Sequence, residues 1–156
     1  MIHLEFGLFF SFRGELGEGL SINCLELLAV LIACRQYGNR WARKRIRMHC
    51  DNTASCFTLG SGASKSPTMM VAQRGIALEA ARCHFQIRGD WISTHDNIGA
   101  DAASRDDIER LRTWAKRTLG ATTLTQVEPL LDIEAYLRRM QKALVSEQRR
   151  LERSTR

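Results

Sequence analysis

The chain has 156 residues and a formal net charge of +6, with 44% hydrophobic and 26% charged residues. At about 100–200 residues per domain, this length allows one compact domain and leaves little room for a second. The apolar fraction is close to the globular average and only two prolines occur, which excludes wholesale disorder and a collagen-like chain. The positive balance favours a polyanionic partner, although many soluble domains carry a modest positive charge without one.

The cysteine pattern and the lengths of the apolar segments indicate in which cellular compartment the protein is expected. Five cysteines occur without a CxxC pair, so neither a disulfide framework nor a zinc ribbon is expected. The longest near-apolar run, residues 22–34, is shorter than the ~20 residues that a bilayer requires. No basic region precedes the aromatic segment near the N-terminus. We therefore expect an intracellular protein, cytoplasmic or nuclear, with no signal peptide, transmembrane segment or membrane partner.

The first half of the chain predicts strands, a long helix and a further strand. Residues 4–12 are rich in aromatic side chains and predict one or two strands, followed by a glycine-rich turn over 13–19. Asn23 stands three residues before Glu26, which is the spacing of a capping box at the start of a helix running to about Gln36. Gly38 is expected to end that helix. Residues 45–51 alternate polar and apolar side chains, which is the period of a strand.

The middle of the chain predicts two helices, a strand and a short helix. Residues 52–59 favour a short helix, 60–66 a loop, and Pro67 suits the first turn of a long helix capped by Ser66. That helix is expected to end near Cys83, with a strand over 84–92 and a helix over 100–104. The order helix, strand, helix, helix, strand, helix is typical of an α/β fold with a parallel strand pair.

After Arg105 the sequence predicts a helical extension. Two helical stretches, about 107–118 and 133–150, are separated by a threonine-rich linker around 122–125. The second has a weak apolar stripe, and its basic end from Arg149 is expected to fray. We expect a solvated helical tail.

Three carboxylates stand out. Glu26 lies in an apolar helix, where a charge costs several kcal/mol unless a cation or donor receives it, or unless it reaches back to the Asn23 amide as a capping residue. Asp51 closes a strand, at the end where α/β sheets bind ligands, although it could instead cap the next helix. Asp101 follows small residues and could be an ordinary first-turn carboxylate. Together they could converge on divalent metal through oxygen ligands.

The phrases that hold these residues are similar to a known family. "INCLELLAVLIA", "MHCDNTASCFTLGSGASKSP" and "WISTHDNIGADAASR" together resemble the RNase H domain of retroelement polyproteins, most of all that of DIRS-like elements. In those elements the domain lies between a reverse transcriptase and a tyrosine recombinase. The resemblance covers about residues 21–105. It implies an RNase H-like mixed sheet flanked by helices, and cleavage of the RNA strand of RNA–DNA hybrids with Mg²⁺ as the cofactor and Mn²⁺ as an alternative.

The resemblance also assigns roles. Glu26, Asp51 and Asp101 match catalytic, metal-binding carboxylates of the family. The residues placed where contacts with nucleic acid are expected are Asn52, Ser64, Lys65, Asn97 and Arg105. Lys65 could meet a phosphate, together with the free N–H groups of the helix that begins at Pro67. A plain helix cap explains the serines around Lys65 equally well. The partners implied are an RNA–DNA hybrid or other nucleic acid, and the polymerase and recombinase modules of the element.

One family feature is missing. The first strand of the family carries a metal-binding aspartate, and the only acids before Glu26 are Glu5, Glu15 and Glu18, none in a matching phrase. We therefore expect residues 1–105 to be an RNase H-like domain that lacks its first strand because the chain is truncated at the N-terminus. Residues 106–156 would be a helical extension or a connector toward a recombinase.

The sequence leaves three functions open. The first is metal-dependent hydrolysis of RNA in a hybrid. The second is an inactive remnant that binds nucleic acid but lacks the first catalytic aspartate. The third sets the family aside and takes the chain as a small α/β protein whose C-terminal helices mediate self-association.

Overall fold

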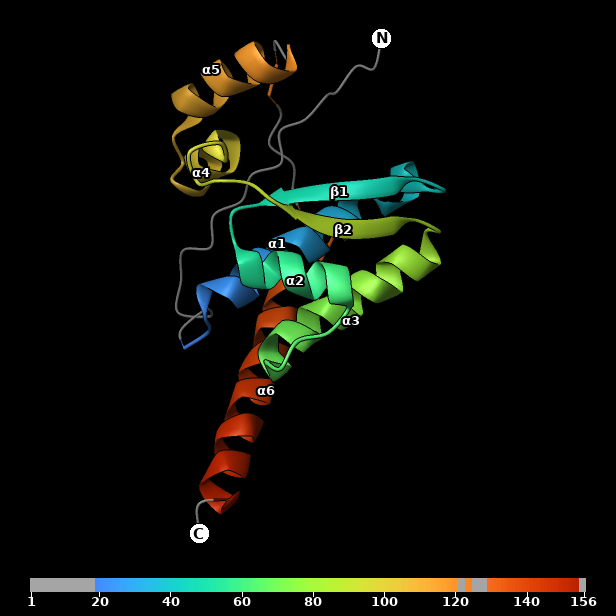
Figure 1. Ribbon diagram of the computed structural model, residues 1–156, viewed down its shortest axis with the longest axis vertical. Helices are drawn as coiled ribbons and strands as arrows, with labels where there is room; N and C mark the ends of the chain where they lie inside the picture. The colour runs from blue at the N-terminus through green and yellow to red at the C-terminus, as the bar shows by residue number, and fades with distance from the viewer. Residues whose placement is uncertain (1–18, 121–122, 125–128, 155–156) are drawn as a thin grey trace. The chain divides into compact units, whose positions relative to one another are not determined.

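The computed structural model describes residues 19–120, 123–124 and 129–154 (Figure 1). The strands predicted over 4–12, most of the turn predicted over 13–19 and the three early acids lie outside these residues. The chain divides into two compact units. We call Gly14–Trp91 with Pro129–Arg156 the sheet unit, and Met1–Arg13 with Ile92–Glu128 the small unit.

The described part of the sheet unit is an α/β arrangement that is mostly helical. Its elements are α1 (Ile22–Tyr37), η2 (Gly38–Trp41), β1 (Arg45–Cys50), α2 (Thr53–Ser61), α3 (Pro67–Arg82), β2 (Gln86–Trp91) and α6 (Ile133–Ser154). The strands pair in parallel, with Arg45 opposite Gln86 and Cys50 opposite Trp91. A parallel pair needs a long crossover, which α2 and α3 provide. The predicted parallel pair is confirmed.

The local signals in the sequence place most helix ends correctly. Asn52 caps α2, and the Ser66 hydroxyl accepts from the Met69 N–H at the start of α3, with Pro67 in its first turn. One expectation for α1 is wrong: Asn23 lies inside the helix, and the preceding cap position makes no side-chain hydrogen bond. The expectation for Gly38 is confirmed, since it caps the C-terminus of α1. Its right-handed φ of −50° lets the chain continue directly into η2.

The core of the sheet unit forms where α1 packs against α3. Leu27, Leu28 and Leu31 of α1 are fully buried, as is Ile76 of α3. The helices approach closely at Gly75, where an added Cβ would lie 2.8 Å from Leu31 Cδ2. A residue larger than glycine would therefore force the buried Leu31 side chain to move. Figure 1 shows α1, α2 and α3 gathered on one side of the strand pair.

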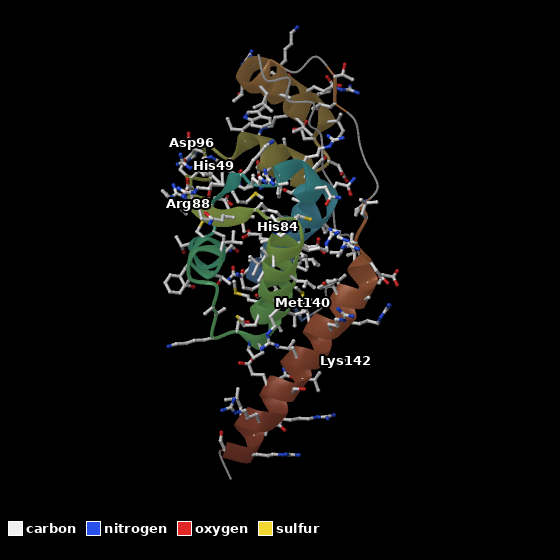
Figure 2. All side chains as sticks on the ribbon, turned by 90° about the vertical axis from the view of Figure 1, so that its right-hand side faces the viewer. His49, His84, Arg88, Asp96, Met140 and Lys142 are labelled. Atoms are coloured by element: carbon white, nitrogen blue, oxygen red, sulfur yellow. The ribbon has the colours of Figure 1, made fainter. Side chains whose placement is uncertain are left out.

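The C-terminal helix belongs to this core. α6 packs along α3, and its Leu137 and Met140 side chains are buried. Met140 and Lys142 are labelled in Figure 2, and Lys142 is exposed. The expectation of a solvated helical tail is therefore wrong for α6, because its apolar stripe has a partner in α3. The helix also continues to Ser154, past the point at which fraying was expected.

One face of the strand pair is exposed, and α2 packs against the other. Exposed and half-buried residues alternate along β1, and α2 packs against the strand pair. At Gly89 of β2 an added Cβ would lie 2.6 Å from the Cys56 Cα, so α2 can approach only because this residue has no side chain. His49 and Arg88, labelled in Figure 2, are exposed residues of β1 and β2.

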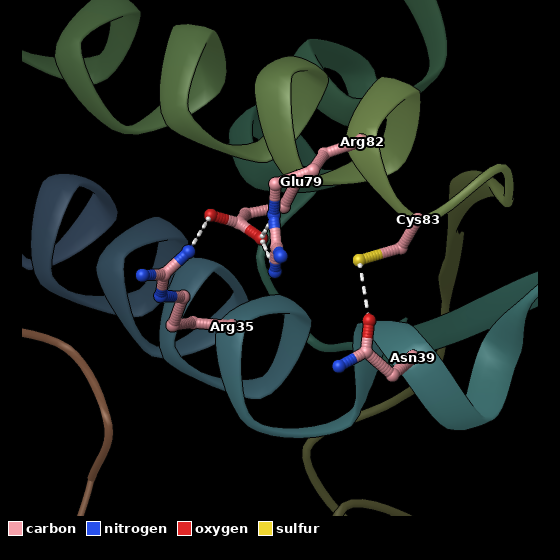
Figure 3. A network of polar contacts seen from close by, with 5 residues as sticks. All are labelled: Arg35, Asn39, Glu79, Arg82 and Cys83. Carbon is pink, nitrogen blue, oxygen red and sulfur yellow. Dashed lines mark hydrogen bonds and ion pairs between the residues drawn. The ribbon is translucent and has the colours of Figure 1, made fainter.

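A buried carboxylate joins α1 to α3 (Figure 3). Glu79 accepts hydrogen bonds from Arg35 Nη1 at 2.7 Å and from Arg82 Nη2 at 2.6 Å. Beside it, the Cys83 thiol lies 3.3 Å from Asn39 Oδ1. The two arginines compensate the burial of this carboxylate, which belongs to a residue that is only 6% exposed.

The small unit holds α4 (Ile98–Ser104) and α5 (Ile108–Leu119) in its described part. The α4 helix begins two residues earlier than predicted, and Gly99 in its first turn packs against the Trp114 ring, 2.6 Å from an added Cβ. Gly120 ends α5 with a left-handed φ of +65°. In the described residues of both units, no helix combines the length and the apolar character needed to cross a membrane.

Candidate functional site

Glu26 and Asp51 come together in the sheet unit. Glu26 lies on α1, and Asp51 directly follows β1 at the carboxyl end of the parallel pair. Burial raises the pKa of Glu26, and the negative charge of Asp51 raises it further. Hydrogen bonds from the Asn52 and Ser55 side chains oppose that shift. The fold therefore holds two carboxylates within electrostatic range of each other.

The α2 N-terminus supports this pair. Asn52 Oδ1 accepts hydrogen bonds from the N–H groups of Ala54 at 2.9 Å and Ser55 at 3.1 Å. Its Nδ2 donates to Asn23 Oδ1 at 2.6 Å, which ties α2 to α1. The Ser55 hydroxyl, 1% exposed as a residue, lies 3.5 Å from Glu26 Oε2. The side chain of Asn52, which the resemblance assigns to nucleic acid, thus makes hydrogen bonds to the α2 N-terminus, to Asn23 and to Glu26.

The end of β2 contributes Trp91. Its indole N–H donates to the main-chain carbonyl of Asp51 at 3.2 Å. The residue is 57% exposed and lies opposite Cys50 in the register. Trp91 therefore holds the backbone of Asp51 while much of its own side chain stays exposed.

Two thiols flank Asp51. Cys50 precedes it, and the Sγ atoms of Cys50 and Cys56 are 3.2 Å apart. Burial and the neighbouring Cys56 raise the pKa of Cys50 to about 12, and the charges of Glu26 and Asp51 act in the same direction. Cys50 is therefore a neutral thiol at physiological pH.

Asp101 belongs to the small unit, where two arginines bind it. Arg105 Nε donates to its Oδ1 and Arg110 Nη1 to its Oδ2, each at 2.8 Å. The hydrogen bond from Arg105 holds the pKa of Asp101 below its usual range, and Arg110 lowers it further. Asn97 occupies the cap position of α4 without a side-chain cap hydrogen bond. Of the family-assigned residues, Asn97, Asp101 and Arg105 thus lie together in this unit.

Ser64 and Lys65 lie in the loop before α3. Ser64 Oγ accepts from the Ser66 N–H at 3.1 Å, so this hydroxyl shapes the loop. Lys65 is exposed and lines a groove between this loop and α6, to which Arg150 also contributes. The structure therefore places two basic side chains along one groove of the sheet unit, and the sequence predicted only the first.

The donor set of the carboxylate pair suits a hard cation. Carboxylate oxygens are the ligands that Mg²⁺ and Mn²⁺ prefer, and a divalent ion would relieve the mutual repulsion of Glu26 and Asp51. Within the described part of each unit, no three His, Cys, Asp or Glu side chains group closely enough to hold an ion. The described residues of the sheet unit therefore offer two carboxylate ligands at this place.

Sequence reasoning missed three residues at this site. The sequence predicts Asn23 as a helix cap. Its position one turn before Glu26 on the same helix also places it near that carboxylate. Ser55 follows Asp51 by four residues. Trp91 ends the second parallel strand, and the rule that ligands bind at the carboxyl ends of such strands could have singled it out.

Comparisons with known proteins add no relative. The chain matches no protein-family model, no curated protein and no solved structure. The functional argument therefore depends on the residues and on the geometry that joins them.

Proposed function

We propose that this chain is an RNase H-like domain of retroelement type, whose reaction is metal-dependent hydrolysis of the RNA strand of an RNA–DNA hybrid. The observation that carries the proposal is the meeting of Glu26 and Asp51 at the carboxyl end of a parallel strand pair. This is the end of an α/β sheet at which ligands bind. The order of α1, β1, α2, α3 and β2 supports the same proposal, because the resemblance places the carboxylates on such elements.

The residues of this chain would hold and orient the ion. Glu26 and Asp51 supply oxygen ligands for Mg²⁺ or Mn²⁺, and Asn52 and Ser55 hydrogen-bond to Glu26. The bound ion would activate a water and stabilise the leaving oxygen of a phosphodiester. The resemblance assigns Asp101 as a metal ligand as well, and within the small unit its carboxylate is paired with Arg105 and Arg110.

Basic side chains would position the hybrid. Lys65 and Arg150 line one groove, to which Pro67 in the first turn of α3 also contributes, and their positive charges suit phosphate groups. Contacts of this kind set the register of a nucleic acid without reading its sequence. The polymerase and recombinase modules named by the resemblance belong to the proposal as partners.

Cleavage of a labelled hybrid in Mg²⁺ tests the proposal. Product is expected with the wild-type chain and is expected to fall to the protein-free background in Asp51→Asn and Glu26→Gln. Asp90→Asn is the matched control, because Asp90 is an acid of β2 that pairs with Arg47 of β1 and is not part of the site. An unchanged rate in Asp51→Asn would refute the assignment.

The second candidate function is binding of the hybrid without cleavage. It is favoured because, in the described part of the sheet unit, Glu26 and Asp51 stand as a pair and no third such ligand joins them. Binding that weakens steeply with salt, with no product in Mg²⁺ or Mn²⁺, would establish it. The absence of binding at low salt would contradict both candidates.

A further inference from the structure

The thiol pair beside Asp51 has no part in the proposed hydrolysis. Cys50 is the last residue of β1 and Cys56 lies in the first turns of α2, yet their Sγ atoms are only 3.2 Å apart. The Cys56 sulfur also lies 3.6 Å from the main-chain oxygen of Cys50. Five residues separate the two cysteines, and among them are Asp51 and Asn52.

The fold holds these sulfurs together from both sides. The Cys56 N–H donates to the Asn52 carbonyl at 3.0 Å, in a helix whose start is fixed by the Asn52 side chain. From the other side, β2 abuts the Cys56 backbone at Gly89, where an added Cβ would lie 2.6 Å from the Cys56 Cα. The backbone of Cys56 is therefore held against the strand that carries Cys50 and its neighbour β2.

Exposure separates this pair from the other three cysteines. Cys50 and Cys56 are partly exposed, whereas Cys24, Cys34 and Cys83 are buried. A small oxidant dissolved in water can therefore reach the pair, and the buried thiols serve as internal references.

We propose that Cys50 and Cys56 are a redox modification site that forms a reversible intramolecular disulfide on exposure to hydrogen peroxide. The Cys56 sulfur, in the first turn of α2, attacks one peroxide oxygen, becomes a sulfenic acid and releases one water. The Cys50 sulfur then attacks the Cys56 sulfur, the S–S bond forms, and the sulfenic hydroxyl leaves with the Cys50 proton as a second water. Two thiols are oxidised and one peroxide is reduced. The two sulfurs must close from 3.2 Å to the ~2.05 Å of a disulfide.

The bond would tie the end of β1 to α2 in a ring that contains Asp51 and Asn52. Asn52 is the residue that holds Asn23 of α1. Oxidation would thereby restrict the segment that carries one of the two candidate carboxylates. The modification itself does not depend on the proposed hydrolase function.

Peptide mapping tests the proposal on the full folded chain. The chain is treated with hydrogen peroxide, its remaining thiols are alkylated, and it is digested without reductant for mass spectrometry. The expected result is one linked pair of peptides that contain Cys50 and Cys56, lighter by two hydrogens than the reduced pair. Treatment with dithiothreitol should return both cysteines to alkylation.

Two variants sharpen the result. Cys56→Ser should abolish the linked peptides, whereas Cys83→Ser should keep them, since Cys83 is buried beside Asn39. The wild-type chain decides the question if either variant fails to fold. Full alkylation of Cys50 and Cys56 after peroxide, a bridge to another cysteine, or sulfinic acid without a bridge would overturn the proposal. Each of these outcomes can be read whether or not the chain cleaves a hybrid.

Discussion

Glu26 is a single residue of the candidate site whose charged carboxylate lowers the stability of the folded chain. Its carboxylate is half-buried, faces the charge of Asp51 and receives hydrogen bonds from Asn52 and Ser55. Asp101 shows the opposite case, since Arg105 and Arg110 stabilise its charge. In the absence of a divalent ion, the raised pKa of Glu26 means that its charged form costs the folded state free energy.

Glu26→Gln is therefore expected to raise the free energy of unfolding at pH 7 in metal-free buffer. The folded-state pKa of Glu26 lies above its unfolded value, so the destabilising effect of the charge is complete above the folded pKa. It declines as pH falls through that pKa and vanishes below the ordinary value of about 4.3. Thermal unfolding of both proteins between pH 4 and 8 measures the difference.

Glu109→Gln is the control for this measurement, because Glu109 is an exposed glutamate on α5, paired with Arg112. Its effect is expected to stay within ~0.5 kcal/mol. A Glu26→Gln chain that is less stable than wild type at pH 7 would show that the hydrogen bonds of the charged carboxylate outweigh its repulsion from Asp51.

The contact between α2 and β2 positions the site at the scale of elements. Asp51 joins β1 to α2, and the Asn52 cap fixes where α2 begins. How closely α2 approaches β2 depends on Gly89, which faces the Cys56 backbone rather than a flexible side chain. The placement of Ser55 and Cys56 therefore follows from the absence of one Cβ in another element.

Gly89→Ala is expected to destabilise the chain by about 1–3 kcal/mol, because the added methyl must push α2 off β2. Urea unfolding measures this change. Gly60→Ala on α2 is the matched control, since an added Cβ there meets no atom within 4 Å. That control should stabilise the chain by up to ~1 kcal/mol through the helix propensity of alanine. Equal effects of the two substitutions would mean that α2 is not in tight contact with β2.

At the scale of the whole molecule, α6 returns to complete the sheet unit. It follows α5 in the sequence but packs on α3, where its Leu137 and Met140 side chains are buried. Glu79, with its two arginines, joins α3 to α1 in the same unit. Residues after position 128 are therefore part of the core that supports the carboxylate pair.

Met140→Ala is accordingly expected to lower the free energy of unfolding by about 2–5 kcal/mol, since it opens a cavity between α6 and α3. Lys142→Ala on the same helix should change it by less than ~0.5 kcal/mol, because Lys142 is exposed. Both values come from chemical denaturation of the full chain. A Met140→Ala chain as stable as wild type would show that α6 is dispensable to the core.

Structural features that depend on neighbouring residues could be predicted from the sequence, whereas contacts between residues far apart in the sequence could not. The Asn52 and Ser66 caps depend on a few neighbouring residues, so the starts of α2 and α3 were predictable. Asn23 misled the prediction because it matched a cap motif locally, while its true partner, Asn52, lies 29 residues away. The Glu79 network went unnoticed for the same reason, since Arg35 lies 44 residues from it.

The sequence by itself determined the order of elements, the parallel strand pair and the end of that pair at which Asp51 lies, because side-chain periodicity and caps act over a few residues. Only the tertiary structure decided that Asn23, Ser55 and Trp91 surround the carboxylates, that Cys50 meets Cys56, and that α6 is core. Those outcomes depend on how closely helices and strands approach. Two glycines, Gly75 and Gly89, set that approach across distant parts of the chain.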